Sequence, residues 1–170
     1  YDEIKSAIDF LKCMGFTVVQ AREEADPQCA GINIAGKAYG VISEDWDTLV
    51  FGAENMITNF TRKGKIVEYN KNEVLSALGV TQDQFVELAM ILGCDYCDGI
   101  SIIGIDKSLE VDMLYNKYME YGSLEKLLIG LKNENNENKK TETNKYKKSG
   151  IRYIIPPELA KDWRNIKAQF

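Results

Sequence analysis

The sequence predicts an α/β fold in which a parallel sheet flanked by helices is followed by a helical second half. In the first 69 residues, short β-branched or apolar runs alternate with segments of helical pattern, which is typical of strands joined by crossover helices. From residue 70 onward, the apolar residues recur at helical spacing. This change of period divides the chain into an α/β part and a helical part.

Three segments of the first half predict strands, one predicts a helix and one predicts a hairpin. Residues 2–14 predict an amphipathic helix, because apolar side chains recur at helical spacing up to a glycine. Residues 16–20 are β-branched and apolar and predict a buried strand. Further strands are predicted at residues 39–42 and 56–60, and a Lys-Gly-Lys turn leads into a hairpin strand at residues 66–69.

The second half predicts a series of helices. The second of them starts with a capping box, since Thr81 is followed three residues later by Gln84. A Pro-Pro pair introduces the last one. Helical patterns are predicted at residues 72–78, 82–92, 105–118, 123–131 and 157–170.

Residues 132–148 break this pattern. These 17 residues comprise six Lys, five Asn, three Glu, two Thr and one Tyr. No apolar face can be drawn along them, and such composition is typical of disorder. We therefore expect a disordered loop at about residues 132–148.

The composition limits the classes of function. Hydrophobic residues make up 45% and charged residues 28% of the 170 residues, which excludes a disordered or fibrous chain. No apolar run approaches the ~18 residues of a membrane span, so we expect no membrane partner. The sequence has no histidine, which excludes His-dependent catalysis and His–Cys zinc sites. Four cysteines are too few for a disulfide framework, so we expect a reducing nuclear or cytoplasmic location.

The charge balance is acidic. Lys and Arg number 21 against 26 Asp and Glu, which gives a formal net charge of −5. Taken alone, this argues against a free-standing nucleic-acid binder. The chain begins at Tyr1 without an initiator Met or the layout of a signal peptide, and we expect it to be a piece of a longer protein.

Carboxylates are the side chains most suited to carry chemistry here. Three acidic clusters each follow an apolar run, namely Glu24 with Asp26, Asp45 with Asp47, and Asp95. Loops beyond the carboxyl ends of parallel strands gather in one crevice, and residues at i and i+2 of an extended chain point the same way. Converging carboxylates need a cation, and oxygen ligands without His or Cys select Mg²⁺ or Mn²⁺. Two such ions about 4 Å apart can clamp a phosphodiester.

Each acidic pair also has a purely structural interpretation. Glu24 and Asp26 are suited to the N-terminus of a helix, and Asp45 and Asp47 are suited to a capped turn. The residues alone leave these alternatives open for each pair.

Three segments resemble motifs of the XPG/flap endonuclease family. Residues 21–30, AREEADPQCA, are similar to the family segment A-P-x-E-A-E-A-x-C-A. Residues 43–52, SEDWDTLVFG, are similar to T-E-D-x-D-x-L-x-F-G. Residues 92–100, LGCDYCDGI, resemble L-G-x-D-Y-x-x-x-I. The order and the gaps also match, and the likeness runs from about residue 3 to residue 104.

This resemblance implies a fold and an activity. It implies a PIN-like sheet in an internal nuclease region, residues 1–92, followed by a helical C-terminal region, residues 93–170, with a helix–two-turn–helix-like element. The implied activity is that of a metal-dependent, structure-specific 5′ nuclease, which hydrolyses DNA phosphodiesters at flaps or junctions in replication and repair. The implied partners are branched or flapped DNA and a sliding clamp bound through regions outside this chain.

The resemblance also implies site residues. The family's metal-ligand positions, for two Mg²⁺ ions with Mn²⁺ as a substitute, fall on Glu24, Asp26, Asp45, Asp47 and Asp95. The family's DNA-contacting positions fall on Glu24, Gly93 and Asp95.

Residues 99–104 resemble the turn that grips duplex DNA in this family through a K⁺ ion. By resemblance, the main-chain carbonyls of Gly99, Ile100 and Ile103 hold that ion. The sequence departs from the pattern beyond this point, because the family's G-I-G reads Ile-Ile-Gly here and Asp106 stands where a basic helix start is usual. An aspartate near a phosphate is repulsive, which puts the duplex-gripping role in question.

Two other readings stay open. Family members carry an N-terminal region with two further metal-binding aspartates and basic residues that engage the scissile phosphate, and nothing in this chain corresponds to it. A catalytically incomplete, nuclease-like domain that binds branched DNA or a protein is therefore an alternative. A PIN-type ribonuclease is another, although the helical second half favours the flap endonuclease reading.

Cys94 and Cys97 have the spacing of a redox motif or of half a zinc site. No second ligand pair lies at a suitable distance in the sequence, and Cys13 and Cys29 are isolated. We expect neither a zinc nor a redox role for this pair.

Overall fold

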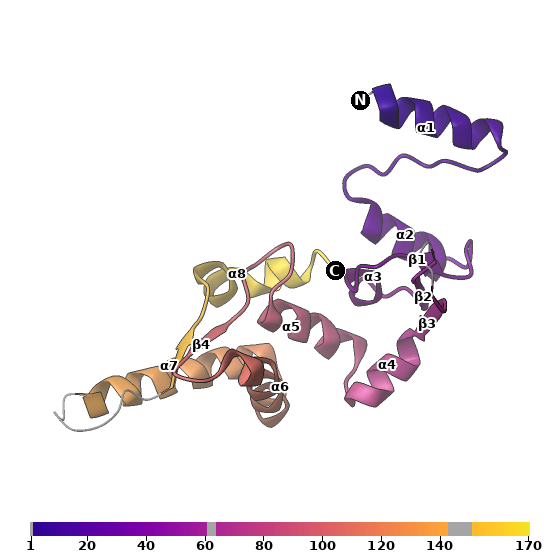
Figure 1. Ribbon diagram of the computed structural model, residues 1–170. Coiled ribbons are helices and arrows are strands. Elements are labelled where there is room, and N and C mark those ends of the chain that lie inside the picture. Colours follow the sequence, from indigo (N-terminus) through magenta and orange to yellow (C-terminus); the bar gives the residue numbers. More distant parts are fainter. Residues whose placement is uncertain (1, 61–63, 143–150) are drawn as a thin grey trace.

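A computed structural model describes residues 2–60, 64–142 and 151–170 (Figure 1). The first half contains α1 (Asp2–Cys13), α2 (Ala25–Ile34), β1 (Val41–Ile42), α3 (Asp47–Val50), β2 (Asn55–Thr58), β3 (Val67–Asn70) and α4 (Lys71–Leu78). The second half contains α5 (Gln82–Leu92), β4 (Ser101–Ile103), the 3-10 helix η1 (Lys107–Leu109), α6 (Glu110–Tyr121), α7 (Leu124–Glu142), β5 (Arg152–Ile154) and α8 (Pro157–Lys167). The predicted α/β class is confirmed.

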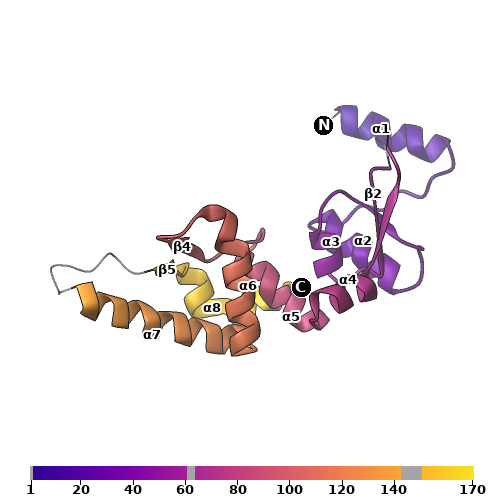
Figure 2. The same ribbon diagram turned by 60° about the horizontal axis from the view of Figure 1, so that its bottom comes forward.

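The molecule is elongated, with the N-terminal sheet at one end and the later helices at the other (Figures 1 and 2). Helix α5 lies between them and contacts α3, α6 and α8. The C-terminal end of the chain returns to the α3 side, where the Phe170 and Phe51 rings are 5.1 Å apart between centroids. The last residues therefore lie beside the first half of the chain.

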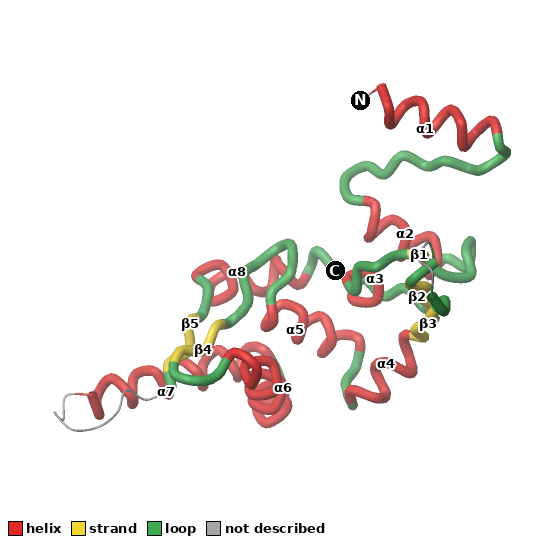
Figure 3. Tube along the Cα trace, viewed as in Figure 1, coloured by secondary structure: helices red, strands yellow, loops and turns green. Residues whose placement is uncertain are grey.

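The main sheet is mixed rather than wholly parallel. Strand β1 pairs with β2 in parallel, with Val41 opposite Met56, and β2 pairs with β3 antiparallel, with Met56 opposite Tyr69. The predicted hairpin is thus confirmed as the β2–β3 pair. A second, two-stranded sheet joins β4 and β5 far along the chain (Figure 3).

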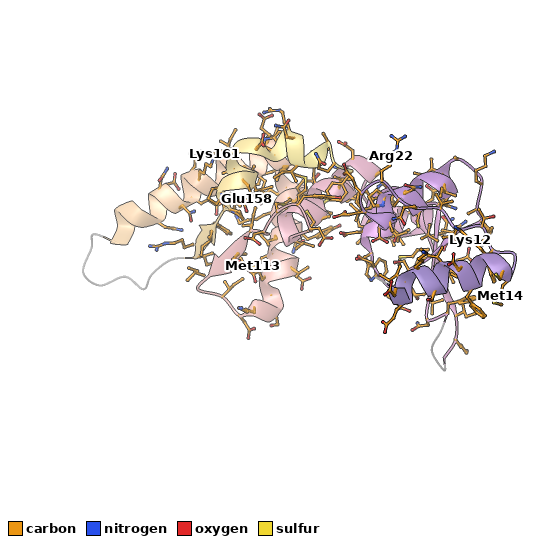
Figure 4. All side chains as sticks on the ribbon, turned by 90° about the horizontal axis from the view of Figure 1, so that it is seen from above. Lys12, Met14, Arg22, Met113, Glu158 and Lys161 are labelled. Carbon is orange, nitrogen blue, oxygen red and sulfur yellow. The ribbon has the colours of Figure 1, made fainter. Side chains whose placement is uncertain are left out.

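The predicted buried strand at residues 16–20 is wrong. This segment is loop, and Phe16 and Val19 are exposed. β-branched residues form a strand only where a neighbouring strand pairs with them, and no described strand does so here. The preceding helix α1 forms as predicted, yet it buries none of its residues. Figure 4 shows α1, with Lys12 near its end and Met14 just beyond it, along the outside of the molecule.

The predicted disordered loop at residues 132–148 is wrong over its first part, because α7 runs on to Glu142. Two asparagine side chains of this stretch bond to the backbone of residues 151 and 153. The amide of Asn135 donates to the Tyr153 carbonyl at 2.7 Å and accepts from the Tyr153 N–H at 2.9 Å. The amide of Asn138 donates to the Ile151 carbonyl at 2.7 Å. Residues 143–148 lie outside the described residues.

The helix predicted at residues 105–118 starts later than expected. The side chain of Asp106 accepts a hydrogen bond from the Ser108 N–H at 2.9 Å and so caps η1, after which α6 begins at Glu110. The other predicted helices of the second half are confirmed. At α5, the Thr81 hydroxyl accepts from the Gln84 N–H and the Gln84 side chain accepts from the Thr81 N–H, so the capping box is present.

The largest core surrounds α5. Fully buried side chains of this core include Met90, Ile91, Leu114, Tyr118, Leu127 and Leu159. One carboxylate lies among them. Glu87 accepts hydrogen bonds from the Tyr118 hydroxyl at 2.8 Å and the Leu124 N–H at 2.9 Å, and it pairs with Lys167 at 2.7 Å. This buried group ties α5 to α6, α7 and α8. The residues on both sides of the predicted boundary at 92 share this core, and the division itself stays a prediction.

Candidate active site

Glu24 and Asp26 lie at the start of α2. Glu24 is the N-cap residue, and Asp26 is in the first turn. The Glu24 carboxylate does not cap the helix; instead its Oε2 accepts a hydrogen bond from the Tyr96 hydroxyl at 3.0 Å. Glu24 and Asp26 thus lie at a helix N-terminus, as the structural interpretation of this pair expected. The Glu24 side chain, however, bonds to a residue far along the chain.

Asp45 and Asp47 lie at the start of α3, not on an extended strand. The Asp45 Oδ1 accepts from the Asp47 N–H at 3.0 Å, and the Asp45 N–H donates to the Ser43 hydroxyl at 3.0 Å. The capped-turn alternative therefore describes the backbone of this pair. The same turn sets the Asp47 side chain at the first position of the helix.

Asp95 lies in a tight two-residue turn. The Cys94 N–H donates to the Cys97 carbonyl at 3.0 Å, and the Cys97 N–H donates to the Cys94 carbonyl at 3.1 Å. These bonds close the turn that presents Asp95 and Tyr96. Burial and the nearby Cys94 raise the pKa of the Cys97 thiol to about 12.

Four of the five predicted carboxylates act on the fifth, Asp47. Burial raises the pKa of Asp47, and the negative charges of Asp45, Asp95, Asp26 and Glu24 raise it further, in that order. Like charges raise the pKa of a carboxylate when they lie nearby. The structure therefore gathers three separate motifs around Asp47.

The carboxylate oxygens of these five residues are of the type that binds a hard divalent cation. Carboxylate donors without thiolate or imidazole are the ligand set of Mg²⁺ and Mn²⁺. Burial and like charges both disfavour the ionised form of Asp47, and a bound cation would offset both effects. Among the described residues, however, no three acidic or other metal-binding side chains lie close enough to form a ready ligand group. The donor chemistry fits, while the carboxylates have to move together to bind one ion.

Tyr96 is a site residue that the sequence reasoning missed. Besides its hydrogen bond to Glu24, its ring packs edge-on against Phe51, 6.4 Å between centroids, and against Phe170, 5.3 Å between centroids. Burial and the bond to Glu24 raise the pKa of Tyr96 to about 12. Its place beside Asp95 in the third motif is the only signal for it in the sequence.

Gly93 and Gly99 are held by a close approach of two backbone segments. Gly93 has a φ of 106°, and a Cβ added there would lie 3.1 Å from the Gly99 nitrogen. A Cβ on Gly99 would clash with the Leu92 carbonyl. The adjacent Ile100 is buried, and its N–H donates to the Ile91 carbonyl at 2.8 Å. The close approach of the two backbone segments therefore requires glycine at positions 93 and 99, independently of any contact with DNA.

The predicted turn at residues 99–104 is partly a strand. Ile103 belongs to β4 and lies opposite Arg152 of β5. Hydrogen bonds from the Ser108 N–H and hydroxyl lower the pKa of Asp106 beside this segment. A negative charge therefore stays where the family resemblance predicts a phosphate.

A groove of about 630 Å³ opens beside the gathered carboxylates. Asp47 and Gly93 both line it, together with Trp46 and apolar side chains of α4, α5 and α6. The acidic site thus has an open apolar groove on one side.

Figure 4 shows the Arg22 side chain directed away from the ribbon near α2.

Comparison with known proteins agrees with the motifs. The XPG I-region family model matches residues 15–95, a range that contains all five carboxylates. Flap endonuclease 1 of Trypanosoma brucei brucei is 36% identical over 169 residues, which cover 96% of this chain and 37% of that protein. The chain belongs to the XPG/flap endonuclease family. It spans little more than a third of the length of this relative.

Solved structures of XPG/flap endonuclease family members share the fold. The flap endonuclease-1 of Methanococcus jannaschii superposes with a TM-score of 0.61 at 28% identity, over 70% of this chain and 36% of that one. The catalytic core of Rad2 in complex with DNA substrate superposes with a TM-score of 0.66 at 28% identity, over 78% of this chain and 42% of that one. The XPG/flap endonuclease family is a family of metal-dependent nucleases.

Among the described residues, no helix is both long and apolar enough to cross a membrane.

Proposed function

We propose that this chain supplies the catalytic carboxylates of a metal-dependent, structure-specific 5′ nuclease that hydrolyses DNA phosphodiesters at flaps or junctions. The observation that carries the proposal is Asp47, whose pKa is raised by burial and by the four other predicted carboxylates. Family membership and a similar protein solved with DNA substrate support the same activity.

Mg²⁺, with Mn²⁺ as a substitute, is the proposed cofactor, held by Glu24, Asp26, Asp45, Asp47 and Asp95. When bound, a pair of such ions polarises water and stabilises negative charge on a phosphodiester. This chain's own residues set the positions of the carboxylates. Tyr96 holds Glu24 by a hydrogen bond, and the other four come from a helix start, a capped turn and a tight turn.

The DNA is proposed to lie along the groove beside Asp47, close to Glu24, Gly93 and Asp95. Gly93 lines this groove and has no side chain that would keep a sugar-phosphate backbone away. A K⁺ ion held by the carbonyls of Gly99, Ile100 and Ile103 is proposed for the duplex. The sliding clamp, bound through regions outside this chain, and a nuclear or cytoplasmic location stay proposals of the same kind.

The test is cleavage of 5′-flap DNA by the protein that carries this chain. We expect Asp47→Asn and Asp95→Asn to lose cleavage by several decades, because each removes a ligand charge from a positioned site. Asp9→Asn is the matched control, since Asp9 is exposed on α1 and is not among the charges that raise the pKa of Asp47. Near wild-type cleavage by either site variant would place the active site elsewhere.

The two alternatives have separate outcomes in the same assay. A catalytically incomplete domain would bind flap DNA and cleave none, in wild-type and variant protein alike. A PIN-type ribonuclease would cleave single-stranded RNA in preference to flap DNA. Substrates of both kinds, each with Mg²⁺ and with chelator, therefore distinguish all three functions.

A further inference from the structure

Two thiols lie on either side of the turn that carries Asp95 and Tyr96. The sulfur atoms of Cys94 and Cys97 are 3.7 Å apart. The two residues also exchange both backbone hydrogen bonds, at 3.0 Å and 3.1 Å, as an isolated antiparallel bridge. From the sequence we expect no redox role, because no second ligand pair lies at a suitable distance and the other two cysteines are isolated. Spacing, however, does not specify where the two side chains point.

The backbone geometry suits a covalent bond between these sulfurs. Residues that exchange both backbone bonds in an antiparallel bridge have Cα atoms about 5.5 Å apart, and disulfide-linked residues most often have Cα atoms about 5.5–6 Å apart. A disulfide needs its sulfurs at about 2.05 Å. The remaining approach requires rotation of the two side chains and leaves the backbone of the turn in place.

The two thiols differ in access. Cys94 is partly exposed, whereas Cys97 is buried and contacts the Met90 carbonyl at 3.6 Å. The exposed Cys13 and Cys29 have no sulfur neighbour among the described residues. An oxidant from solution therefore meets Cys94, and Cys97 is the only described thiol in a position to resolve the product.

We propose that Cys94 and Cys97 are a redox modification site. Oxidation by a small-molecule disulfide of the glutathione type forms a reversible disulfide between the two cysteines and so closes the turn around Asp95 and Tyr96. The modification is separate from the proposed nuclease chemistry and does not depend on it.

The reaction takes two exchanges. The Cys94 sulfur attacks one sulfur of glutathione disulfide, which forms a mixed disulfide and releases one glutathione thiolate. The Cys97 sulfur then attacks the Cys94 sulfur, which forms the Cys94–Cys97 bond and releases the second glutathione. The two protons lost by the cysteines are taken up by the two thiolates, and two cysteine thiols are oxidised as one glutathione disulfide is reduced. The second exchange is the slower one, because Cys97 is buried.

The consequence falls on the turn itself. Asp95 and Tyr96 are the two residues enclosed by the bond, and Tyr96 holds Glu24 by its hydroxyl. A covalent closure limits the conformations open to both residues. We expect the amide protons of Asp95 and Tyr96 to exchange more slowly in the oxidised protein than in the reduced protein.

The experiment uses the chain with Cys13→Ser and Cys29→Ser, so that only the pair under test can react. The protein is equilibrated in glutathione buffers of decreasing reduced fraction, quenched by acid, alkylated and analysed by intact mass and peptide mapping. We expect both thiols to disappear together, with a cross-linked peptide that joins Cys94 and Cys97, and both to return on addition of dithiothreitol. Cys97→Ser should instead stop at the mixed disulfide on Cys94.

Three results would overturn the proposal. One is a stable glutathione adduct on Cys94 with Cys97 free, and another is a disulfide between two chains. The third is both thiols still free in the most oxidising buffer while an unstructured peptide of residues 90–101 is oxidised. Since the measurement is made on protein that keeps both thiols of the pair, it does not depend on the folding of Cys97→Ser.

Discussion

The hydroxyl of Tyr96 donates a hydrogen bond of 3.0 Å to the carboxylate of Glu24, across 72 residues of sequence. The bond joins the third acidic motif to the first. The Tyr96 ring is held in turn by Phe51 and by Phe170 at the end of the chain. Tyr96 therefore acts as a positioning residue, through which packing of the second half fixes a carboxylate of the first half.

Tyr96→Phe should loosen Glu24 while it keeps the aromatic packing. Loss of a hydrogen bond of this kind costs about 0.5–1.5 kcal/mol in the free energy of unfolding. We expect a loss in this range by urea titration, together with a lower cleavage rate at unchanged DNA affinity. Tyr39→Phe is the matched control, because Tyr39 makes a comparable bond to Glu68 on an exposed surface. Equal effects of both variants on cleavage would argue against a positioning role.

The same tyrosine gives a prediction for alkaline pH. Burial, and then the bond to Glu24, raise the pKa of Tyr96 from 10.0 to about 12. Because the folded state keeps its proton longer, the contribution of Tyr96 to stability is complete below the unfolded pKa and is lost as the pH rises through the folded pKa. Wild-type protein should therefore lose more stability than Tyr96→Phe between about pH 10 and about pH 12. Parallel pH curves in urea titrations would contradict this assignment.

Local patterns predicted those parts of the fold that local forces decide. The capping box at Thr81 and the hairpin into β3 depend on residues a few positions apart, and both form as expected. Residues 16–20 have strand composition, but a strand needs a partner that the local sequence does not specify. The extension of α7 depends on bonds from Asn135 to Tyr153, 18 residues away.

The candidate site divides in the same way. Its carboxylates were found by their motifs, because their types and spacings are written in the sequence. The bond between Tyr96 and Glu24 and the sulfur contact between Cys94 and Cys97 were not found. Each depends on where a turn directs a side chain, and spacing alone does not determine that direction.

Asp47→Asn should stabilise the metal-free protein and remove its response to divalent metal. Burial and four like charges raise the pKa of Asp47, so its ionised form is disfavoured in the folded state. Stability from this group is present at low pH and is lost as the pH rises through the folded pKa. At neutral pH the neutral amide should gain up to about 1 kcal/mol.

Melting with chelator and with millimolar Mn²⁺ measures both effects. An ion that binds only the folded state stabilises it by mass action, so the wild-type melting temperature should rise with Mn²⁺ and that of Asp47→Asn should not. Asp9→Asn should respond like the wild type. A wild-type melting temperature that is unchanged by metal would count against the proposed centre.

Glu87→Gln should destabilise the second half more than any surface charge does. Glu87 is buried, and it accepts from Tyr118 and Leu124 while it pairs with Lys167. Burial opposes the charge of Lys167, but bonds to Asp83 and Glu87 outweigh it and raise the pKa of Lys167. Glu87→Gln removes one of the two carboxylates that pair with Lys167 and leaves only the exposed Asp83.

We expect Glu87→Gln to cost about 1–3 kcal/mol in urea titrations, as for a buried group that loses a charged partner. Glu125→Gln is the matched control, since Glu125 pairs with Arg164 on an open surface, where such pairs contribute about 0–1 kcal/mol. If both variants lose the same stability, Glu87 is not the link between these helices.

The 170-residue chain by itself should bind flap DNA weakly. Its net charge is −5, and a polyanion is repelled by such a surface, while affinity for DNA comes largely from cations that displace counterions. The carboxylates gathered around Asp47 add negative charge where the phosphate has to approach. Divalent metal should therefore raise the affinity, and Asp47→Asn should raise it in the absence of metal. Fluorescence anisotropy with a labelled flap, in chelator and in Ca²⁺ to prevent cleavage, measures both changes. Tight binding in chelator, with a steep dependence on salt, would mean that a cationic DNA surface is present in this chain and that net charge is the wrong guide to its affinity.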